Sequence, residues 1–196
     1  MPKRALVVFA HPVPESFSAA LHKTVVETLQ STGWEIDDCD LYAEGFSPVL
    51  TTEERRNYHD LSINTSPVQG YVDRLNAAEA LFLVFPVWNF GYPAILKGFF
   101  DRVFLPGVSF KLVDGKVRPN LENIKTLVAV TTYGGTRVRA FLAGDPPRKC
   151  ITRPVRYVTN HKTTIRYLAL YDMNRATQQD RTAFQSKVAN TLKRLA

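Results

Sequence analysis

Cysteine is scarce in this chain. The 196 residues contain only Cys39 and Cys150, and neither belongs to a Cys-x-x-Cys pair. Two isolated cysteines cannot build a disulfide framework or a zinc site, so small disulfide-rich proteins and zinc-binding domains are both excluded. Cysteine used in this way is typical of a reducing compartment. We therefore expect a cytoplasmic protein without a bound metal.

Long hydrophobic runs are also missing. The apolar run at 80–88 is far shorter than the stretch of about 20 residues that spans a bilayer. A basic start at 1–4 precedes another apolar stretch, but this stretch already ends at His11-Pro12. It predicts a first strand rather than a signal peptide, and we expect no membrane insertion.

No block of five or six like charges occurs, although the chain is basic. Lys and Arg number 25 against 18 Asp and Glu, which gives a net charge of +7. This balance favours anionic ligands, whereas the scattered charges argue against a nucleic-acid-binding module. The largest local excess is a group of four side chains, namely Arg148, Lys149, Arg153 and Arg156.

Glycine is absent from the loop at 11–18, which follows the first predicted strand. Its absence excludes a dinucleotide fingerprint and a Walker loop. The loop instead offers His11, Ser16, Phe17 and Ser18 before a predicted helix, whose free N–H groups favour an anion. We expect it to bind a phosphate. The alternatives are that serine only caps the helix and that His11 is a structural histidine bonded to nearby backbone.

Predicted strands alternate with predicted helices five times. This pattern predicts an α/β fold, a doubly wound five-stranded parallel sheet of order 2-1-3-4-5 with helices on both faces, in a single domain over 1–196. A continuous apolar run before Pro86 predicts a central buried strand that ends there, because proline cannot donate to the ladder. The expected strands are 5–10, 34–40, 81–85, 126–132 and 165–171, and a hairpin is expected at 108–119. The expected helices are 18–32, 94–103, 177–195 and one within 147–161 that is entered near Pro154, with a short helix after 51–54 and another that starts at 66.

Aromatic residues cluster directly after the buried strand. Trp88, Phe90 and Tyr92 offer flat apolar faces and Asn89 offers an amide, following Pro86 and Val87. Such an inventory suits a planar aromatic ligand such as a flavin, at the sheet edge where open α/β sheets bind ligands. The alternative is that the aromatic side chains only plug that edge.

A third loop follows the fourth predicted strand at the same edge. It consists of Thr131, Thr132, Tyr133, Gly134 and Gly135. Glycine lets backbone N–H groups approach a ligand closely. Since reduction of a flavin places negative charge near N1 and O2 of its ring, such amides would stabilise the reduced form. The alternative is a flexible glycine turn.

These segments together resemble the flavodoxin-fold NAD(P)H:quinone reductases, which include azoreductase-type enzymes and potassium-efflux ancillary oxidoreductases. The resemblance runs from the first strand through the third loop, about two thirds of the chain, and its most specific part is 93–104. It is carried by His11-Pro-x-x-x-Ser16-Phe17-Ser18, Phe46-x-Pro48-Val-Leu-Thr51, Pro86-Val-Trp-Asn-Phe90, Pro93-Ala-Ile-Leu-Lys97-Gly-Phe-Phe-Asp101-Arg102-Val-Phe and Thr131-Thr-Tyr-Gly-Gly135.

The resemblance implies a flavin cofactor, NAD(P)H as co-substrate and a quinone or similar acceptor, used in a ping-pong reaction. It assigns the first loop to the flavin phosphate and ribityl chain, the second to the isoalloxazine ring and the third to its pyrimidine edge. It also implies a homodimer. FMN is favoured over FAD, because the long C-terminal extension of the animal FAD-binding members is missing.

One departure from the family concerns catalysis. The animal members carry a tyrosine and a histidine shortly after the third loop, and the segment 136–145 has neither. We therefore assign no catalytic side chain. Arg137 or Arg139 is a candidate for balancing the charge of the reduced flavin or for binding the phosphate of NADPH, and the alternative is that both are solvated surface arginines.

Two other functions compete with this interpretation. An electron carrier of the flavodoxin type is disfavoured, because such carriers are acidic and have a Thr/Ser-Gly-rich first loop. A regulatory or ancillary subunit, in which flavin or nucleotide binding is a signal and turnover is incidental, stays open.

Overall fold

The computed structural model describes residues 3–195 and contains a five-stranded parallel sheet of order β2-β1-β3-β6-β7. Numbered along the chain as parallel strands, this is the predicted order 2-1-3-4-5, which is confirmed. The strands are β1 (Arg4–Phe9), β2 (Glu35–Asp40), β3 (Ala80–Val87), β6 (Thr126–Tyr133) and β7 (Thr164–Leu170).

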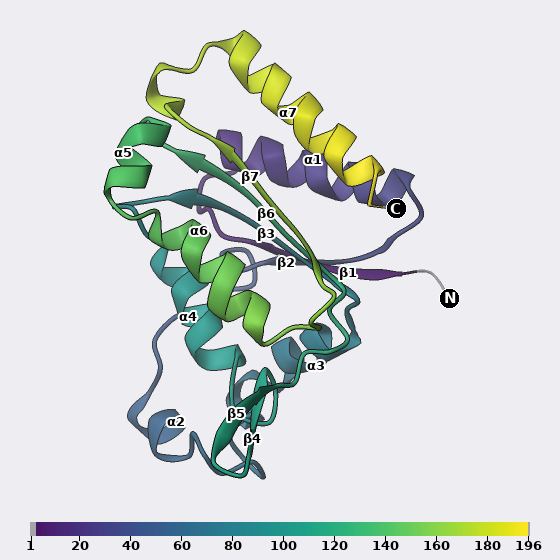
Figure 1. The fold of residues 1–196 in the computed structure, drawn as a ribbon, viewed down its shortest axis with the longest axis vertical. Helices are drawn as coiled ribbons and strands as arrows, with labels where there is room; N and C mark the ends of the chain where they lie inside the picture. Colours follow the sequence, from purple (N-terminus) through teal and green to yellow (C-terminus); the bar gives the residue numbers. More distant parts are fainter. Residues whose placement is uncertain (1–2, 196) are drawn as a thin grey trace.

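Helices cover both faces of the sheet (Figure 1). One face packs against α1 (Phe17–Ser31) and α7 (Gln178–Lys193). The other face packs against α3 (Gln69–Ala77), α4 (Ala94–Val103) and the segment from α6 (Pro146–Cys150) onward. The short helix α2 (Thr52–Arg56) and the hairpin of β4 (Phe110–Val113) and β5 (Lys116–Pro119) lie beyond the sheet, at one end of the molecule.

Strand β3 is the centre of the core. Its alternate residues point to opposite faces: Leu81, Leu83 and Phe85 join one apolar cluster, and Phe82 and Val84 join the other. Each of these five side chains is at most 1% exposed. A strand covered on both faces needs no polar alternation, which explains the continuous apolar run in the sequence.

The prediction that this strand ends at Pro86 was wrong. Pro86 pairs with Thr132, and the ladder continues to Val87. The carbonyl of Val84 accepts from the N–H of Ala10 on the β1 side. Residues two apart direct their backbone groups to the same side, so Pro86 also faces that side, where the pairing of β1 with β3 has already ended. The missing N–H of Pro86 therefore costs no ladder bond.

The single helix predicted at 147–161 is also corrected. Helix α6 already begins at Pro146, and a π-helical turn η2 (Ile151–Val155) contains Pro154. Proline removes a helical hydrogen bond and its ring clashes with the preceding turn, which the wider π turn accommodates. A further short helix, α5 (Arg137–Leu142), was not predicted. Within residues 3–195, no helix combines the length and the apolar character that crossing a membrane requires.

Candidate functional site

The loops after β1, β3 and β6 meet at the carboxyl edge of the sheet. They enclose a cleft of about 220 Å³, to which the segment after β7 also contributes. Nine of the fourteen residues predicted from the sequence line this cleft. The lining consists of His11, Ser16, Phe17, Ser18, Pro86, Val87, Trp88, Thr132, Gly134, Met173 and Asn174.

Ser16 ends the first loop as the N-cap of α1. Its Oγ accepts from the N–H of Ala19 at 3.1 Å, which confirms the capping role. Accepting this bond leaves the hydroxyl proton of Ser16 free to donate. The first two backbone N–H groups of the helix, those of Phe17 and Ser18, lie at the positive end of the helix dipole, which attracts anions. Cap and anion site are therefore compatible in this loop.

His11 is held in one tautomer. Its Nδ1 accepts from the N–H of Val13 at 3.0 Å, so the ring proton resides on Nε2. Burial lowers the pKa of His11 below its usual value, which favours the neutral ring. The ring centroid lies 5.6 Å from that of Trp88. His11 thus makes a structural hydrogen bond to the backbone and also lines the cleft, where its Nε2–H is available as a donor.

The second loop is a tight, strained turn. Trp88 and Gly91 exchange two backbone hydrogen bonds of 3.2 and 2.8 Å. Between them, Asn89 and Phe90 have φ values of 50° and 55°. Two consecutive residues with positive φ define a type I′ turn, which is uncommon for a phenylalanine and costs on the order of 1–3 kcal/mol at each strained residue. Strain of this kind concentrates at functional sites.

Tyr92 packs against the core, as the plugging alternative expects, whereas the other two aromatic side chains of this segment do not. Trp88 and Phe90 are each 41% exposed. Trp88 lines the cleft, whereas Asn89 and Phe90 lie outside its lining. The turn therefore presents aromatic surface at the rim, where a planar ligand can lie against it.

The third loop divides its residues between the cleft and the core. Thr132 and Gly134 line the cleft, and Thr131 is fully buried. The amides of Gly134 and Gly135 make no hydrogen bond within residues 3–195, so they are free to donate to a ligand. The expectation of open backbone donors in this loop therefore matches the structure.

The side chain of Tyr133 points away from the cleft, into the layer of α6. Its hydroxyl donates to Asp145 Oδ1 at 2.6 Å and lies 2.7 Å from the hydroxyl of Tyr167. Arg148 closes this cluster, with Nε 3.1 Å from Asp145 Oδ2 and the guanidinium over the Tyr167 ring. Burial raises the pKa of both tyrosines, so both stay protonated. The cluster therefore holds the third loop in place on the side away from the cleft.

Two lining residues were missed by sequence reasoning. Met173 and Asn174 belong to the short helix η3 (Met173–Arg175), directly after β7. The amide side chain of Asn174 lies over Gly134. A Cβ atom added to Gly134 would be 3.2 Å from Asn174 Nδ2. The loops are further tied together by the N–H of Asp172, which donates to the carbonyl of Gly135 at 2.8 Å. Parallel strands end at one edge, so the order of the strands already indicated this segment.

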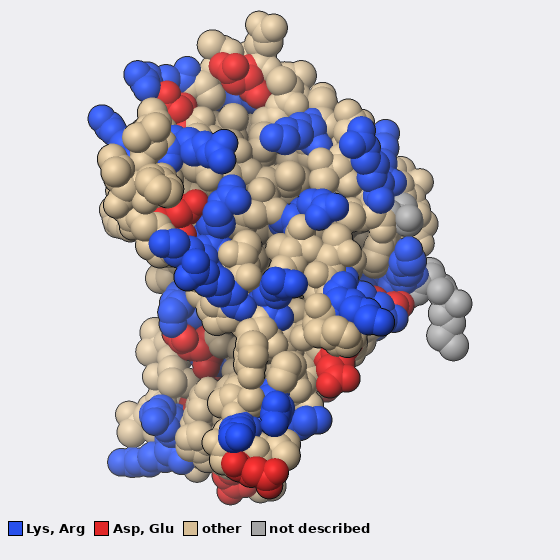
Figure 2. Space-filling view, in the orientation of Figure 1, with Lys and Arg blue, Asp and Glu red and all other residues tan. Residues whose placement is uncertain are grey.

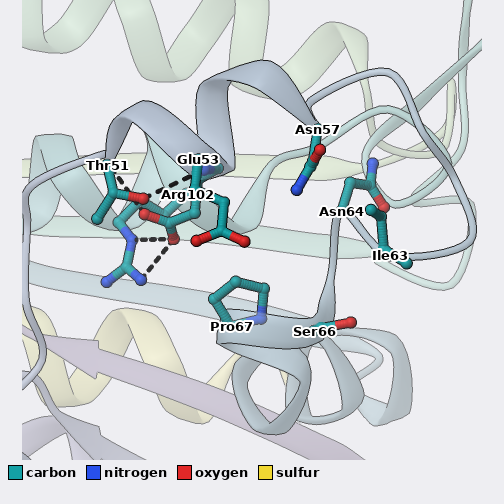
Figure 3. A pocket seen from close by; sticks show the side chains of 9 residues that line it. Thr51, Glu53, Asn57, Ile63, Asn64, Ser66, Pro67 and Arg102 are labelled. Carbon is teal, nitrogen blue, oxygen red and sulfur yellow. Dashed lines mark hydrogen bonds and ion pairs between the residues drawn. The ribbon is translucent and has the colours of Figure 1, made fainter.

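A second cavity of about 450 Å³ lies between α2, the segment after it and α4, away from the three loops. Figure 3 shows Arg102 with its dashed contacts on one side and Asn57 and Asn64 on the other. Glu54 accepts from Arg102 Nε and Nη2 at 2.8 and 2.6 Å, and both side chains are nearly buried. Burial opposes ionisation of Glu54, but the hydrogen bonds from Thr51 and Arg102 lower its pKa. The cation is already paired, so this cavity is a structural junction rather than an anion site.

The chain is an α/β protein with a cleft at the carboxyl edge of a doubly wound parallel sheet, the edge where sheets of this kind bind ligands. The family model described as flavodoxin-like fold matches residues 3–195, so the chain belongs to this family.

Curated relatives carry the names of NAD(P)H oxidoreductases. NAD(P)H dehydrogenase [quinone] 1 of Rattus norvegicus is 32% identical over an alignment of 148 positions, which covers 67% of this chain and 54% of that protein. A protein of Haemophilus influenzae named an uncharacterized NAD(P)H oxidoreductase is 35% identical over 119 residues, which are 60% of this chain and 58% of that one. The matched stretches thus span a little over half the length of these relatives.

Solved structures show the same fold. Smu.1420 of Streptococcus mutans superposes with a TM-score of 0.86 at 27% identity, over 97% of this chain and 99% of that chain. The NAD(P)H:quinone oxidoreductase of Methanothermobacter marburgensis superposes with a TM-score of 0.82 at 22% identity, over the full length of both chains.

Proposed function

We propose that this protein is a flavin-dependent oxidoreductase that transfers hydride from NAD(P)H to quinones or similar aromatic acceptors. One observation carries the proposal: anion donors, an aromatic wall and open glycine amides meet in one cleft. The names of the rat and Haemophilus influenzae relatives support the use of NAD(P)H, and the rat name supports a quinone acceptor. Residues 1–196 would act as a single flavin-binding domain.

The residues of the cleft fit a flavin. The amides of Phe17 and Ser18 with the hydroxyls of Ser16 and Ser18 suit its phosphate, and His11 Nε2–H adds a further donor. The wall formed by Pro86, Val87 and Trp88 suits the flat ring.

At the other end of the cleft, the amides of Gly134 and Gly135 suit the pyrimidine edge of the ring, where they would stabilise the charge of the reduced form. When bound, the flavin would supply the hydride chemistry.

The chain itself would bind and orient rather than transfer protons. His11 is engaged at Nδ1, and the hydroxyl of Tyr133 is turned toward Asp145. We therefore assign no side chain as proton donor. Because one cleft serves both substrates, NAD(P)H and the acceptor would enter in turn, which is a ping-pong sequence. Parallel lines in double-reciprocal plots at several acceptor concentrations would support this order, and intersecting lines would contradict it.

A second copy of the chain would complete the site. The cleft of about 220 Å³ is smaller than the roughly 300–1,000 Å³ of most ligand pockets. Asn89 and Phe90 stand exposed beside it without contributing to its lining. We propose a homodimer in which the partner covers the open side.

We propose FMN rather than FAD, because the anion donors of the cleft belong to the first loop and the start of α1, which suits a single phosphate group. Two neighbouring solved structures, of a Bacillus anthracis azoreductase and of general stress protein 14 of Treponema denticola, are complexes with FMN. A cytoplasmic location is proposed from the free thiols of Cys39 and Cys150.

The test is direct. The purified protein is examined for a flavin absorption spectrum, the released cofactor is weighed by mass spectrometry, and oxidation of NADH and NADPH is followed with a water-soluble benzoquinone. A yellow protein that turns over supports the proposal. A yellow protein without turnover would indicate a regulatory or carrier role, and a colourless protein that refuses FMN and FAD would overturn the proposal.

Two serine variants separate the phosphate site from the helix cap. Ser16→Ala removes the cap and is expected to cost about 1 kcal/mol of stability in addition to flavin affinity. Ser18→Ala removes no cap and is expected to weaken FMN binding with less loss of melting temperature. Unchanged FMN affinity in both variants would contradict the assignment of the first loop.

A further inference from the structure

The charge of this chain is distributed very unevenly. Residues 1–135 contain 12 Lys and Arg against 15 Asp and Glu, a net charge of −3. Residues 136–196 contain 13 Lys and Arg against 3 acidic residues, a net charge of +10, so the two parts add to the overall +7. The whole positive excess therefore comes from the last third of the chain.

This last third folds onto one side of the molecule. It forms α5, α6, the turn η2, the edge strand β7 and α7, which lie together at the front and top in Figure 1. In the same orientation, Figure 2 shows Lys and Arg side chains spread over this face with few acidic side chains among them. We call this surface the basic face. Apart from Arg175, the exposed Lys and Arg residues of this last third are Arg137, Arg139, Lys149, Arg153, Arg156, Lys162, Arg166, Lys187, Lys193 and Arg194.

The acidic side chains of this segment do not neutralise the exposed cations. Asp145 is engaged by Arg148 and Tyr133. Asp172 pairs with Arg175, and Asp180 caps α7. Within residues 3–195, none of the ten exposed cations of the basic face forms an ion pair.

Helix α5 adds exposed apolar side chains at the end of this face next to the cleft. Val138, Phe141 and Leu142 are 66%, 77% and 77% exposed. They stand at i, i+3 and i+4, so they share one side of the helix, while Ala140 is buried beneath. Arg137 and Arg139 belong to the same helix. Large apolar side chains exposed together, in a basic setting, are typical of surfaces that bind membrane interfaces.

We propose that the basic face docks on the surface of an anionic lipid bilayer, with Val138, Phe141 and Leu142 entering the headgroup region. The cations supply attraction to the anionic headgroups, and the three apolar side chains supply burial that a purely electrostatic contact lacks. An isologous contact between two basic faces would bring like charges together, which disfavours a second copy as the occupant. A nucleic-acid backbone would cover the cations but would give Val138 and Leu142 no apolar partner.

Docking would bring the cleft to the quinones that are dissolved in the bilayer, and this role rests on the proposed function. Helix α5 begins at its cap Thr136, directly after Gly135 of the third loop, so a bilayer at α5 lies at the rim of the cleft. Apolar quinones dissolve in bilayers, and a cleft held at the interface could receive them without passage through water.

The test is sedimentation of the purified protein with lipid vesicles. Vesicles of phosphatidylcholine alone are compared with vesicles containing 30% phosphatidylglycerol, at 0.05, 0.15 and 0.5 M NaCl. We expect binding only to the anionic vesicles, weakening steeply as salt rises. Each cation at such a surface contributes about fivefold to partitioning, so Arg153→Gln with Arg156→Gln should lower it about 25-fold.

Matched variants on the hairpin, which lies at the opposite end of the molecule from α5 (Figure 1), serve as controls. Lys111→Gln with Lys116→Gln removes the same charge from β4 and β5 and should leave binding nearly unchanged. Phe141→Ser with Leu142→Ser should weaken binding on the order of tenfold or more, because it removes apolar area from the headgroup region. Leu112→Ser with Val117→Ser, which are 57% and 44% exposed, should not.

Four outcomes would overturn the proposal. These are no binding to anionic vesicles at 0.05 M NaCl, equal binding to both lipid mixtures, equal loss from the hairpin variants, or tight binding to duplex DNA at 0.15 M NaCl without vesicle binding. A changed elution volume of the Phe141 and Leu142 variant in size exclusion would instead place α5 between copies and would also overturn it. The vesicle assay needs no flavin, so a colourless protein that still binds would refute the proposed function alone.

Discussion

The hydroxyl of Tyr133 offers the sharpest test of how the third loop is supported. Tyr133→Phe removes one oxygen that donates to Asp145 Oδ1 at 2.6 Å and lies 2.7 Å from the hydroxyl of Tyr167. A hydrogen bond to a charged group is worth about 1.5–3 kcal/mol. The variant also leaves the hydroxyl of the half-buried Tyr167 without this partner. We therefore expect a loss of about 2–3 kcal/mol.

A loss of this size is easily measured. For a chain of 196 residues, 1 kcal/mol corresponds to roughly 2–4 °C in melting temperature, so the expected decrease is about 5–10 °C. Melting is followed by circular dichroism and FMN affinity by titration of the flavin-free protein. The matched control is Tyr171→Phe. The Tyr171 hydroxyl accepts from Arg148 Nη2 at 3.2 Å and, within residues 3–195, makes no other hydrogen bond, so its loss should matter less.

The pair of readouts distinguishes two roles of Tyr133. A lower melting temperature with a modest loss of FMN affinity would support the buried anchor. A wild-type melting temperature with a large loss of FMN affinity would show that the phenol contacts the flavin and would refute the placement described above. A variant unchanged in both readouts would show that the cluster contributes little.

Three further outcomes are expected. Gly134→Val should lower flavin retention, because its Cβ would lie 3.2 Å from Asn174 Nδ2, and Asn174→Gly should restore part of it unless the ligand itself is crowded. Trp88→Ala should slow turnover roughly tenfold while costing about 1 kcal/mol or less of stability, since the side chain is 41% exposed; unchanged turnover with a large loss of melting temperature would contradict this. The pKa of His11, measured by NMR, should lie below its usual value without ligand and rise when FMN is bound.

The sign of the His11 effect follows from linkage. A bound phosphate dianion favours the charged ring, so it raises the pKa of His11, and FMN binding should tighten as the pH falls through the pKa of the complex. A pKa that stays the same on saturation with FMN would show that the ring does not face the phosphate. Phosphate alone, added at high concentration, is the matched control for an effect of the flavin ring.

Local pattern was sufficient for the architecture. A continuous apolar run at 81–85 needs cover on both faces, and the alternation of strands with helices then leaves few topologies for a parallel sheet. The order β2-β1-β3-β6-β7 followed, and with it the meeting of three loops at one edge. The capping role of Ser16 was likewise readable, because a cap depends on residues only three apart.

The direction of single side chains depended on contacts far apart in the chain. Tyr133 turned to the core because Asp145 and Tyr167 offer it partners there. Asn174 reached Gly134 because β7 lies beside β6. Pro86 stayed in its strand because its neighbour β1 had already ended. None of these reasons is visible in the residues next to the one concerned.

The charge of the chain shows the same division between sequence and tertiary structure. The composition gives the net charge of +7. Along the chain the charges looked scattered, because no run of five or six like charges occurs. Only folding brought α5, α6, β7 and α7 to one side and engaged the three acidic side chains among them with partners of their own. A charged surface is a property of residues that are neighbours in space, and space is set by packing rather than by order along the chain.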